Sequence, residues 1–133
     1  MVSFSPSSAD SLIPSGARFV KHPGDNSCLF HSISFLLSFH DTVPSLHEVS
    51  SGFELRSMIC SYIRDNPSTY ISLASGLIST IADALSSDNF NCLSYSEHLR
   101  DRHTWGGSLE IATVAEKFSI GISVFQWPRG NLG

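Results

Sequence analysis

The sequence has little of what directs a protein to a membrane or to nucleic acid. No apolar run approaches the length of about 18 residues that a membrane-spanning helix needs. The eight lysines and arginines are scattered and the formal net charge is -4, so no basic run could follow a phosphate backbone. The first 16 residues lack the basic and apolar segments of a signal peptide. We therefore expect no membrane and no nucleic-acid partner, and a cytoplasmic or nuclear location.

Cysteine is also scarce. Cys28, Cys60 and Cys92 are an odd number without a close pair, so they predict no disulfide framework and favour a reducing compartment. Cys28 and His31 form a Cys-x-x-His pair, but zinc needs further converging ligands and no second cysteine is near. We expect neither a metal site nor another cofactor.

The composition is that of one folded domain. Hydrophobic residues make up 41% of the chain and charged residues 15%, which is typical of a globular protein. Residues 1–16 are rich in serine and proline and predict a flexible arm. Residues 17–133 are long enough to bury a core and are expected to form a single α/β domain.

The stretch from Gly24 to Ile33 organises the rest of the chain. Asp25, Asn26 and Ser27 are residue types that cap helix starts by accepting backbone N–H bonds. The apolar residues that follow share one helix face: Leu29, Ile33, Leu36 and Leu37. The pattern predicts a helix from Cys28 to about Phe39, apolar on most of its circumference and buried in the domain centre.

Cys28 would lie in the first turn of this helix. There the unpaired amides and the positive end of the helix dipole favour a thiolate over a thiol. The same amides are fixed donors that could bind a developing oxyanion. A lone cysteine near a helix is more often a small buried hydrophobic residue, so Cys28 by itself leaves both interpretations open.

Five further elements are expected along the chain. The apolar spacing predicts a helix through Leu55 and Ile63 that ends at Asn66–Pro67, and another over 68–85. A short helix over 94–102 and a helix beginning near Ser108 follow. Ile120–Phe125 is interpreted as a strand buried on both faces. Glu110 and Glu116 are interpreted as first-turn and surface charges rather than catalytic carboxylates.

The block Thr104–Gly107 combines an aromatic residue with two glycines. Gly106 and Gly107 allow a turn with positive φ or the close approach of another backbone. Trp105 could cover a peptide channel or anchor the turn, and both alternatives remain open. His103 is either an ordinary loop residue or a base for Cys28, since geometry decides between such candidates.

Three blocks resemble the ovarian-tumour (OTU) family of cysteine deubiquitinases. Asp25–Phe30 matches the family's Asp-x-x-Cys-Leu-Phe signature, and 95–125 matches a second block around Thr-Trp-Gly-Gly. Between them, Glu54-Leu55-Arg56 and the region 66–70 are similar to the family's middle helices. The likeness covers about residues 18–126. It implies a papain-type fold, with helices packed on a small central sheet.

The resemblance also implies a function. Cys28 would attack isopeptide bonds at the C-terminus of ubiquitin, within polyubiquitin or another conjugate, or of a related modifier. Asp25 and Cys28 would be the catalytic residues, with Asp25 shaping an oxyanion loop that also contains Asn26. Trp105, Gly106 and Gly107 would wall the channel for an extended Gly-Gly tail.

One part of the family's site has no match in these residues. In the family a catalytic histidine lies near the C-terminal end, after further strands, and no histidine follows His103 here. Three explanations are open: a truncated product, an inactive ubiquitin-binding or scaffold protein, or a substitute base such as His103. We favour truncation, with the C-terminal strands missing and activity impaired. A domain with no link to ubiquitin would show neither binding nor a reactive Cys28.

Overall fold

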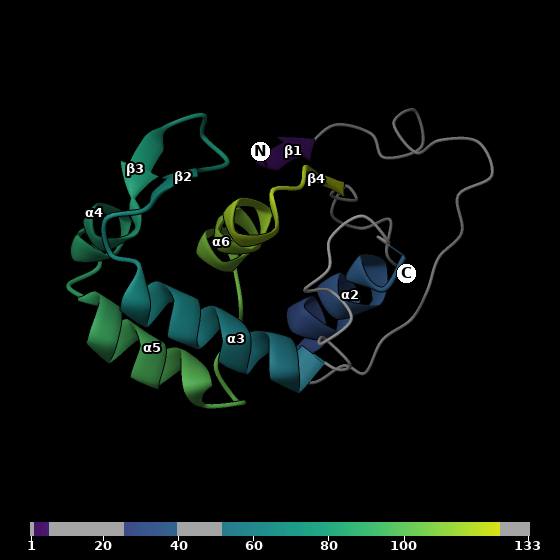
Figure 1. The fold of residues 1–133 in the computed structure, drawn as a ribbon, viewed down its shortest axis with the longest axis horizontal. Helices are drawn as coiled ribbons and strands as arrows, with labels where there is room; N and C mark the ends of the chain where they lie inside the picture. The colour runs from purple at the N-terminus through teal and green to yellow at the C-terminus, as the bar shows by residue number, and fades with distance from the viewer. Residues whose placement is uncertain (1, 6–25, 40–51, 126–133) are drawn as a thin grey trace, which may run out of the picture.

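A computed structural model describes residues 2–5, 26–39 and 52–125. The elements follow one another as β1 (Val2–Ser5), α2 (Cys28–Leu37), α3 (Gly52–Asp65), β2 (Tyr70–Ser72), β3 (Ile78–Thr80), α4 (Ile81–Ser86), α5 (Cys92–Arg100), α6 (Ser108–Phe118) and β4 (Ile122–Phe125). Mixed helices and small sheets confirm the α/β class (Figure 1). None of the helices in these ranges is long and apolar enough to cross a membrane.

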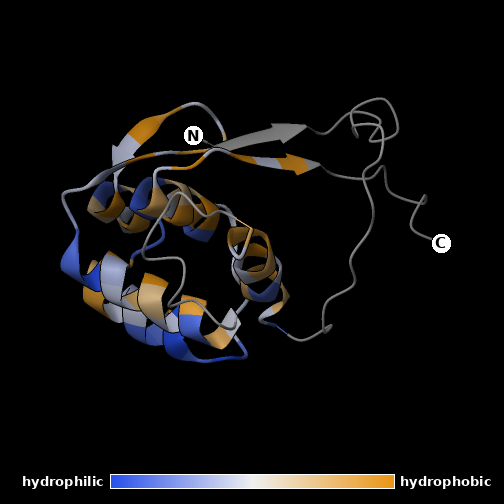
Figure 2. Cartoon of the chain, turned by 45° about the vertical axis from the view of Figure 1, so that its right-hand side comes forward, coloured by the Kyte–Doolittle hydropathy of each residue, from blue (hydrophilic) through white to orange (hydrophobic). Residues whose placement is uncertain are grey.

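The helices pack around one hydrophobic core. Helix α3 lies against both α2 and α5, and α6 occupies the middle of the molecule (Figure 1). The side chains buried at their contacts include Phe30, Leu37, Leu55, Ile59, Ile63, Leu99 and Val114. Figure 2 shows hydrophilic residues along the outer side of the α3–α5 pair. The predicted helices at Cys28, Leu55, Ser94 and Ser108 are therefore confirmed, with boundaries shifted by a few residues.

The centre of the domain is formed by α6 rather than by α2. Residues 110–115 and Phe118 of α6 are all buried. Helix α2 buries one face, through Phe30, Ile33 and Leu37, while Leu36 is 60% exposed. The prediction of a fully buried Cys28 helix was wrong because its apolar circumference is only partly covered.

Residues 68–85 do not form the predicted helix. They form the antiparallel β2–β3 hairpin, with Ile71 opposite Ser79, followed by the short helix α4. Gly76 has φ +87° in the connecting turn, a conformation that glycine adopts without strain. The Thr80 side chain accepts a hydrogen bond from the Asp83 backbone N–H and so starts α4 after the hairpin. Three-and-four spacing alone therefore failed to separate these elements.

Strands β1 and β4 form a parallel pair, with Val2 opposite Ile122. The prediction of a flexible arm over residues 1–16 did not include the strand at Val2–Ser5. Residues 6–16 lie outside the described part of the chain. Strand β4 confirms the strand predicted near the C-terminus. It is not buried on both faces, because Ile122 and Val124 are half-buried whereas Ser123 is exposed.

Candidate active site

Cys28 is the first residue of α2 and is half-buried. Ser27 is the N-cap residue, but its side chain makes no capping hydrogen bond. Its hydroxyl oxygen instead accepts a hydrogen bond from Arg56 Nη2 at 2.9 Å. The predicted capping by the Ser27 side chain is therefore wrong. Asp25 lies outside the described residues, so its place in an oxyanion loop stays a prediction.

Arg56 of α3 is the buried charge nearest to this helix start, only 2% exposed. Nη2 donates to the carbonyl of Asn26 at 3.0 Å as well as to Ser27. Nη1 donates to the carbonyl of Leu99, at the end of α5, at 2.8 Å. The guanidinium also lies over the Phe30 ring, 4.5 Å from its centroid, where a cation–π contact is favourable. One side chain therefore joins α2, α3 and α5.

The segment after α5 approaches the same place. The carbonyls of Asp101 and Arg102 accept from Arg56 at 3.2 and 3.4 Å. The Asn26 side-chain amide donates to the carbonyl of His103. His103 itself is exposed, and its N–H donates to Asp101 Oδ1. The main chain at His103 thus lies beside the residues that precede Cys28.

Gly106 packs directly on the first turn of α2. A β-carbon at Gly106 would lie 2.7 Å from Leu29 Cδ2 and 3.1 Å from Phe30 Cε2, closer than real β-carbons normally approach. Gly107 is different, because a β-carbon there would meet only Glu110 Oε1 at 3.9 Å. Of the two alternatives for these glycines, close approach applies to Gly106, where side chains of α2 are the contact.

Trp105 is 65% exposed and borders a pocket of about 380 Å³. Gly106 and Gly107 also line this pocket, with Tyr95 and Glu110 farther along. Trp105 therefore lies at a pocket edge rather than inside the core as a turn anchor. The three residues predicted to wall a channel do border one hollow of the surface.

Glu110 is a first-turn residue of α6, as expected, but it is buried, which the sequence did not indicate. Oε1 accepts from the Gly107 N–H at 2.8 Å, and Oε2 accepts from the Tyr95 hydroxyl at 2.8 Å. Burial raises the pKa of this carboxyl above its ordinary value, while the two hydrogen bonds act in the opposite direction. Glu110 thereby fixes the backbone that follows Gly106. Glu116 is exposed, as predicted.

His31 packs against the start of α3. Its ring makes an edge-on contact with Phe53, with centroids 5.0 Å apart. Gly52 lies so close that a β-carbon there would be 2.6 Å from the His31 backbone N. In the described part of the chain no three His, Cys, Asp or Glu side chains converge as a metal site.

The other two cysteines are buried in the core. Burial raises the pKa of the Cys60 thiol, and likewise that of Cys92. Cys92 is also the first residue of a helix, α5, but it is buried like Cys60, whereas Cys28 is partly open to solvent. Partial exposure therefore distinguishes the one cysteine that was predicted to be a nucleophile.

A comparison with known proteins identifies the family. The model for OTU-like cysteine proteases matches residues 23–133. The chain belongs to this family. Among OTU-like relatives, it is 24% identical over 102 residues to "Ubiquitin thioesterase OTU1" of Gallus gallus. It is 27% identical over 100 residues to "Putative ubiquitin thioesterase otu1" of Schizosaccharomyces pombe.

The chain spans about a quarter of these relatives. The match to the Gallus gallus protein covers 77% of this chain and 28% of that protein. The match to the Schizosaccharomyces pombe protein covers 75% and 23%, respectively. No solved structure matches the chain significantly.

In this OTU-like chain the structure brings together residues from distant parts of the sequence. Asn26, two residues before Cys28, lies beside the His103 main chain, and Gly106 contacts the residues that follow Cys28. Sequence reasoning missed the contribution of Arg56, which it used only as part of the family resemblance. An arginine in the apolar face of a predicted helix was the one signal that could have indicated it.

Proposed function

We propose that this chain is the nucleophile-bearing part of a thiol-dependent deubiquitinase. The observation that carries the proposal is Cys28 at the start of α2, half-buried, with the Gly106 backbone packed on the same helical turn. Membership of the OTU-like cysteine proteases and the names of the relatives support ubiquitin as the modifier. Cytoplasm or nucleus remains the proposed location.

The reaction would proceed by acyl transfer. The Cys28 sulfur attacks the carbonyl carbon at the C-terminus of ubiquitin, the carbon–nitrogen bond to the lysine amine breaks, and a thioester forms. Backbone amides around Asn26 and Cys28 would hold the oxyanion, with Asp25 shaping their loop. Water then hydrolyses the thioester and restores the thiol.

The proposed reaction also needs a channel for the ubiquitin tail and a base for the Cys28 thiol. Trp105, Gly106 and Gly107 would border the path of an extended Gly-Gly tail, since all three line one pocket. A base must accept the thiol proton and return one to the leaving amine. No histidine follows His103 in these 133 residues, so we expect slow turnover by this chain alone, with His103 as the low-efficiency substitute to test.

The test is cleavage of a diubiquitin panel by the purified chain, with Cys28→Ala as the control. Release of monoubiquitin that depends on Cys28 supports the proposal, and loss of that release in His103→Ala would assign the substitute base. The second candidate is a ubiquitin-binding or scaffold protein without turnover. It predicts binding of diubiquitin that persists in Cys28→Ala while no chain is cleaved.

A further inference from the structure

Arg56 is the feature of the molecule that the proposed chemistry does not use. Its guanidinium is buried between the residues that precede Cys28 and the segment that leaves α5. Its acceptors are main-chain carbonyls and one hydroxyl: those of Asn26, Ser27, Leu99, Asp101 and Arg102. These acceptors belong to two segments that are more than 70 positions apart in the sequence (99 − 27 = 72).

We propose that Arg56 is a positioning residue that assembles the site by holding residues 26–27 against residues 99–102. The inference rests on the proposed function for its meaning, because the two segments carry Cys28 and Trp105–Gly107. The hydrogen bonds of Arg56 to the two segments do not depend on ubiquitin. Without Arg56, the helix start at Cys28 and the loop at His103 would be held together less firmly.

The chemistry of the acceptors explains why the residue is an arginine. The last carbonyls of a helix have no partner within the helix and carry partial negative charge, and Leu99 lies in the last turn of α5. A guanidinium presents several donors in a rigid plane, so one side chain can serve acceptors on two sides at once. A lysine ammonium is a compact charge that cannot span both segments in this way. The contact of the Arg56 guanidinium with the Phe30 ring, 4.5 Å from its centroid, fixes the orientation of the guanidinium plane.

The direct bond between the two segments supports the same arrangement. Asn26 donates from its side chain to His103 and accepts at its carbonyl from Arg56. Asn26 is therefore held on both sides by the contact between the segments. After loss of Arg56, Asn26 would be held by its hydrogen bond to His103 without the hydrogen bond from the guanidinium.

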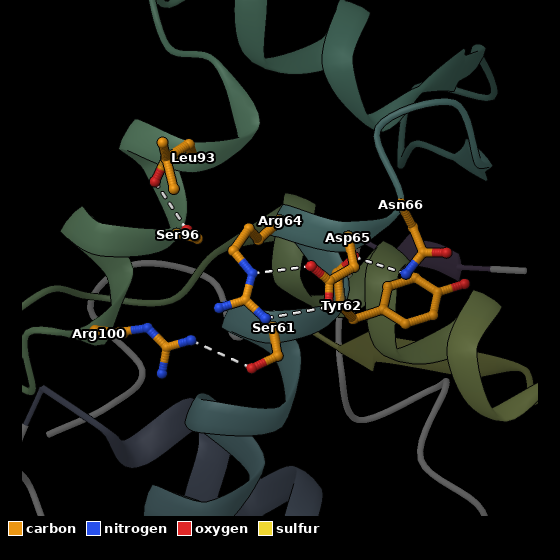
Figure 3. Close-up of polar contacts among 8 residues, drawn as sticks. All are labelled: Ser61, Tyr62, Arg64, Asp65, Asn66, Leu93, Ser96 and Arg100. Carbon is orange, nitrogen blue, oxygen red and sulfur yellow. Dashed lines mark hydrogen bonds and ion pairs between the residues drawn. The ribbon is translucent and has the colours of Figure 1, made fainter.

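Arg64 provides a matched control on the same helix. It is exposed and pairs with its neighbour Asp65, from Nε to Oδ1 at 2.8 Å and from Nη2 to Oδ2 at 3.1 Å (Figure 3). Arg100, nearby, donates to the Ser61 hydroxyl at 3.2 Å (Figure 3). An exposed pair of adjacent residues stabilises little, so Arg64→Lys should leave the chain unchanged.

The experiment is hydrogen exchange of the full chain, read by mass spectrometry, for wild type, Arg56→Lys and Arg64→Lys. In Arg56→Lys, amide exchange should rise by about tenfold in peptides covering 26–28 and 99–104 together, while α6 keeps its protection. An unchanged rate in either segment would overturn the inference. So would an increase spread evenly over the chain, which would indicate only general support of the core.

Two additions keep the test decisive. If Arg56→Lys does not fold, Ser27→Ala removes one acceptor without removing a helix cap, and should raise exchange in the same two segments by a smaller factor. Unchanged exchange in both segments of Ser27→Ala would then overturn the inference. The rate of adduct formation with ubiquitin carrying a C-terminal electrophile separates the two proposals. A wild type without adduct but with the expected exchange pattern refutes the proposed function and leaves the positioning by Arg56 supported.

Discussion

The side-chain amide of Asn26 donates a hydrogen bond to the main-chain carbonyl of His103, although 77 positions separate them. This bond joins the residues before Cys28 to the segment that leads into Trp105 and the two glycines. Gly106 then contacts Leu29 and Phe30. The helix start and the glycine segment therefore form one structural unit, and a change in either should affect both.

The two glycines should respond differently to alanine. Gly106→Ala places a β-carbon 2.7 Å from Leu29 Cδ2 and 3.1 Å from Phe30 Cε2, so the Leu29 side chain, the Phe30 ring or the loop must move. We expect the free energy of unfolding to fall by about 1–3 kcal/mol, as for other overpacked sites. Urea denaturation measures this change. The rate of Cys28 alkylation should change in the same variant.

Gly107→Ala is the control for that experiment. Its β-carbon has only an ordinary contact, and φ −151° at this position is extended backbone that alanine adopts. Its free energy of unfolding should stay within about 0.5 kcal/mol of wild type. Equal effects of the two substitutions would show that the contact of Gly106 with α2 is unimportant.

Stability should depend on pH through Glu110. Because the folded chain raises the pKa of this carboxyl above its ordinary value of 4.5, folding favours the protonated form. The contribution of the protonated Glu110 carboxyl to the stability of the folded chain is fully present below pH 4.5 and is lost as pH rises through the raised pKa. The side chain introduced by Glu110→Gln cannot ionise. As pH rises over that range, the free energy of unfolding of wild type should therefore fall relative to that of the variant.

Tyr95→Phe sharpens this test. The Tyr95 hydroxyl donates to Glu110 Oε2 and thereby lowers the carboxyl pKa relative to burial alone. Without that bond the pKa should rise further, and the loss of stability should extend to higher pH. Urea denaturation of the three proteins between pH 4 and 8 decides the matter. A difference between wild type and Glu110→Gln that does not vary with pH would refute the assignment.

Only one cysteine should react while the chain is folded. Cys60 is fully buried and Cys92 is 8% exposed, and burial raises the pKa of both thiols, which lowers their thiolate content at neutral pH. Iodoacetamide should therefore add one group, at Cys28, and add the others only after denaturation. Peptide mass spectrometry identifies the sites. Labelling of Cys60 or Cys92 as fast as Cys28 in the folded chain would contradict the described packing.

The helices could be predicted from the sequence where local signals agreed. Apolar spacing located α3 and α6, and the abrupt change at Cys28 located the start of α2. The same spacing misled at 68–85. Leu77 and Ile78 fall at helical intervals from Ile81 and Leu85, yet they belong to the hairpin and are exposed, whereas Ile81 and Leu85 are buried in α4. Gly76 was the local signal that could have indicated the turn.

The site was predictable in its residue types but not in its connections. Cys28 and Gly106 stand in recognisable motifs, yet the hydrogen bond from Asn26 to His103 and the acceptors of Arg56 depend on the packing of α2, α3 and α5. The burial of Glu110 likewise depends on Tyr95, which lies 15 positions away on another helix. Such contacts join segments whose separation along the chain carries no periodic signal.

The measurement that tests the central claim most directly is labelling of the folded chain by ubiquitin with a C-terminal electrophile. The probe needs both a reactive sulfur and a surface that presents the ubiquitin tail to it, but it does not need a base for complete turnover. We predict a covalent adduct in wild type, with its cross-linked peptide at Cys28, and none in Cys28→Ala. The absence of an adduct from the folded wild-type chain would contradict the assignment of Cys28 as a nucleophile toward ubiquitin.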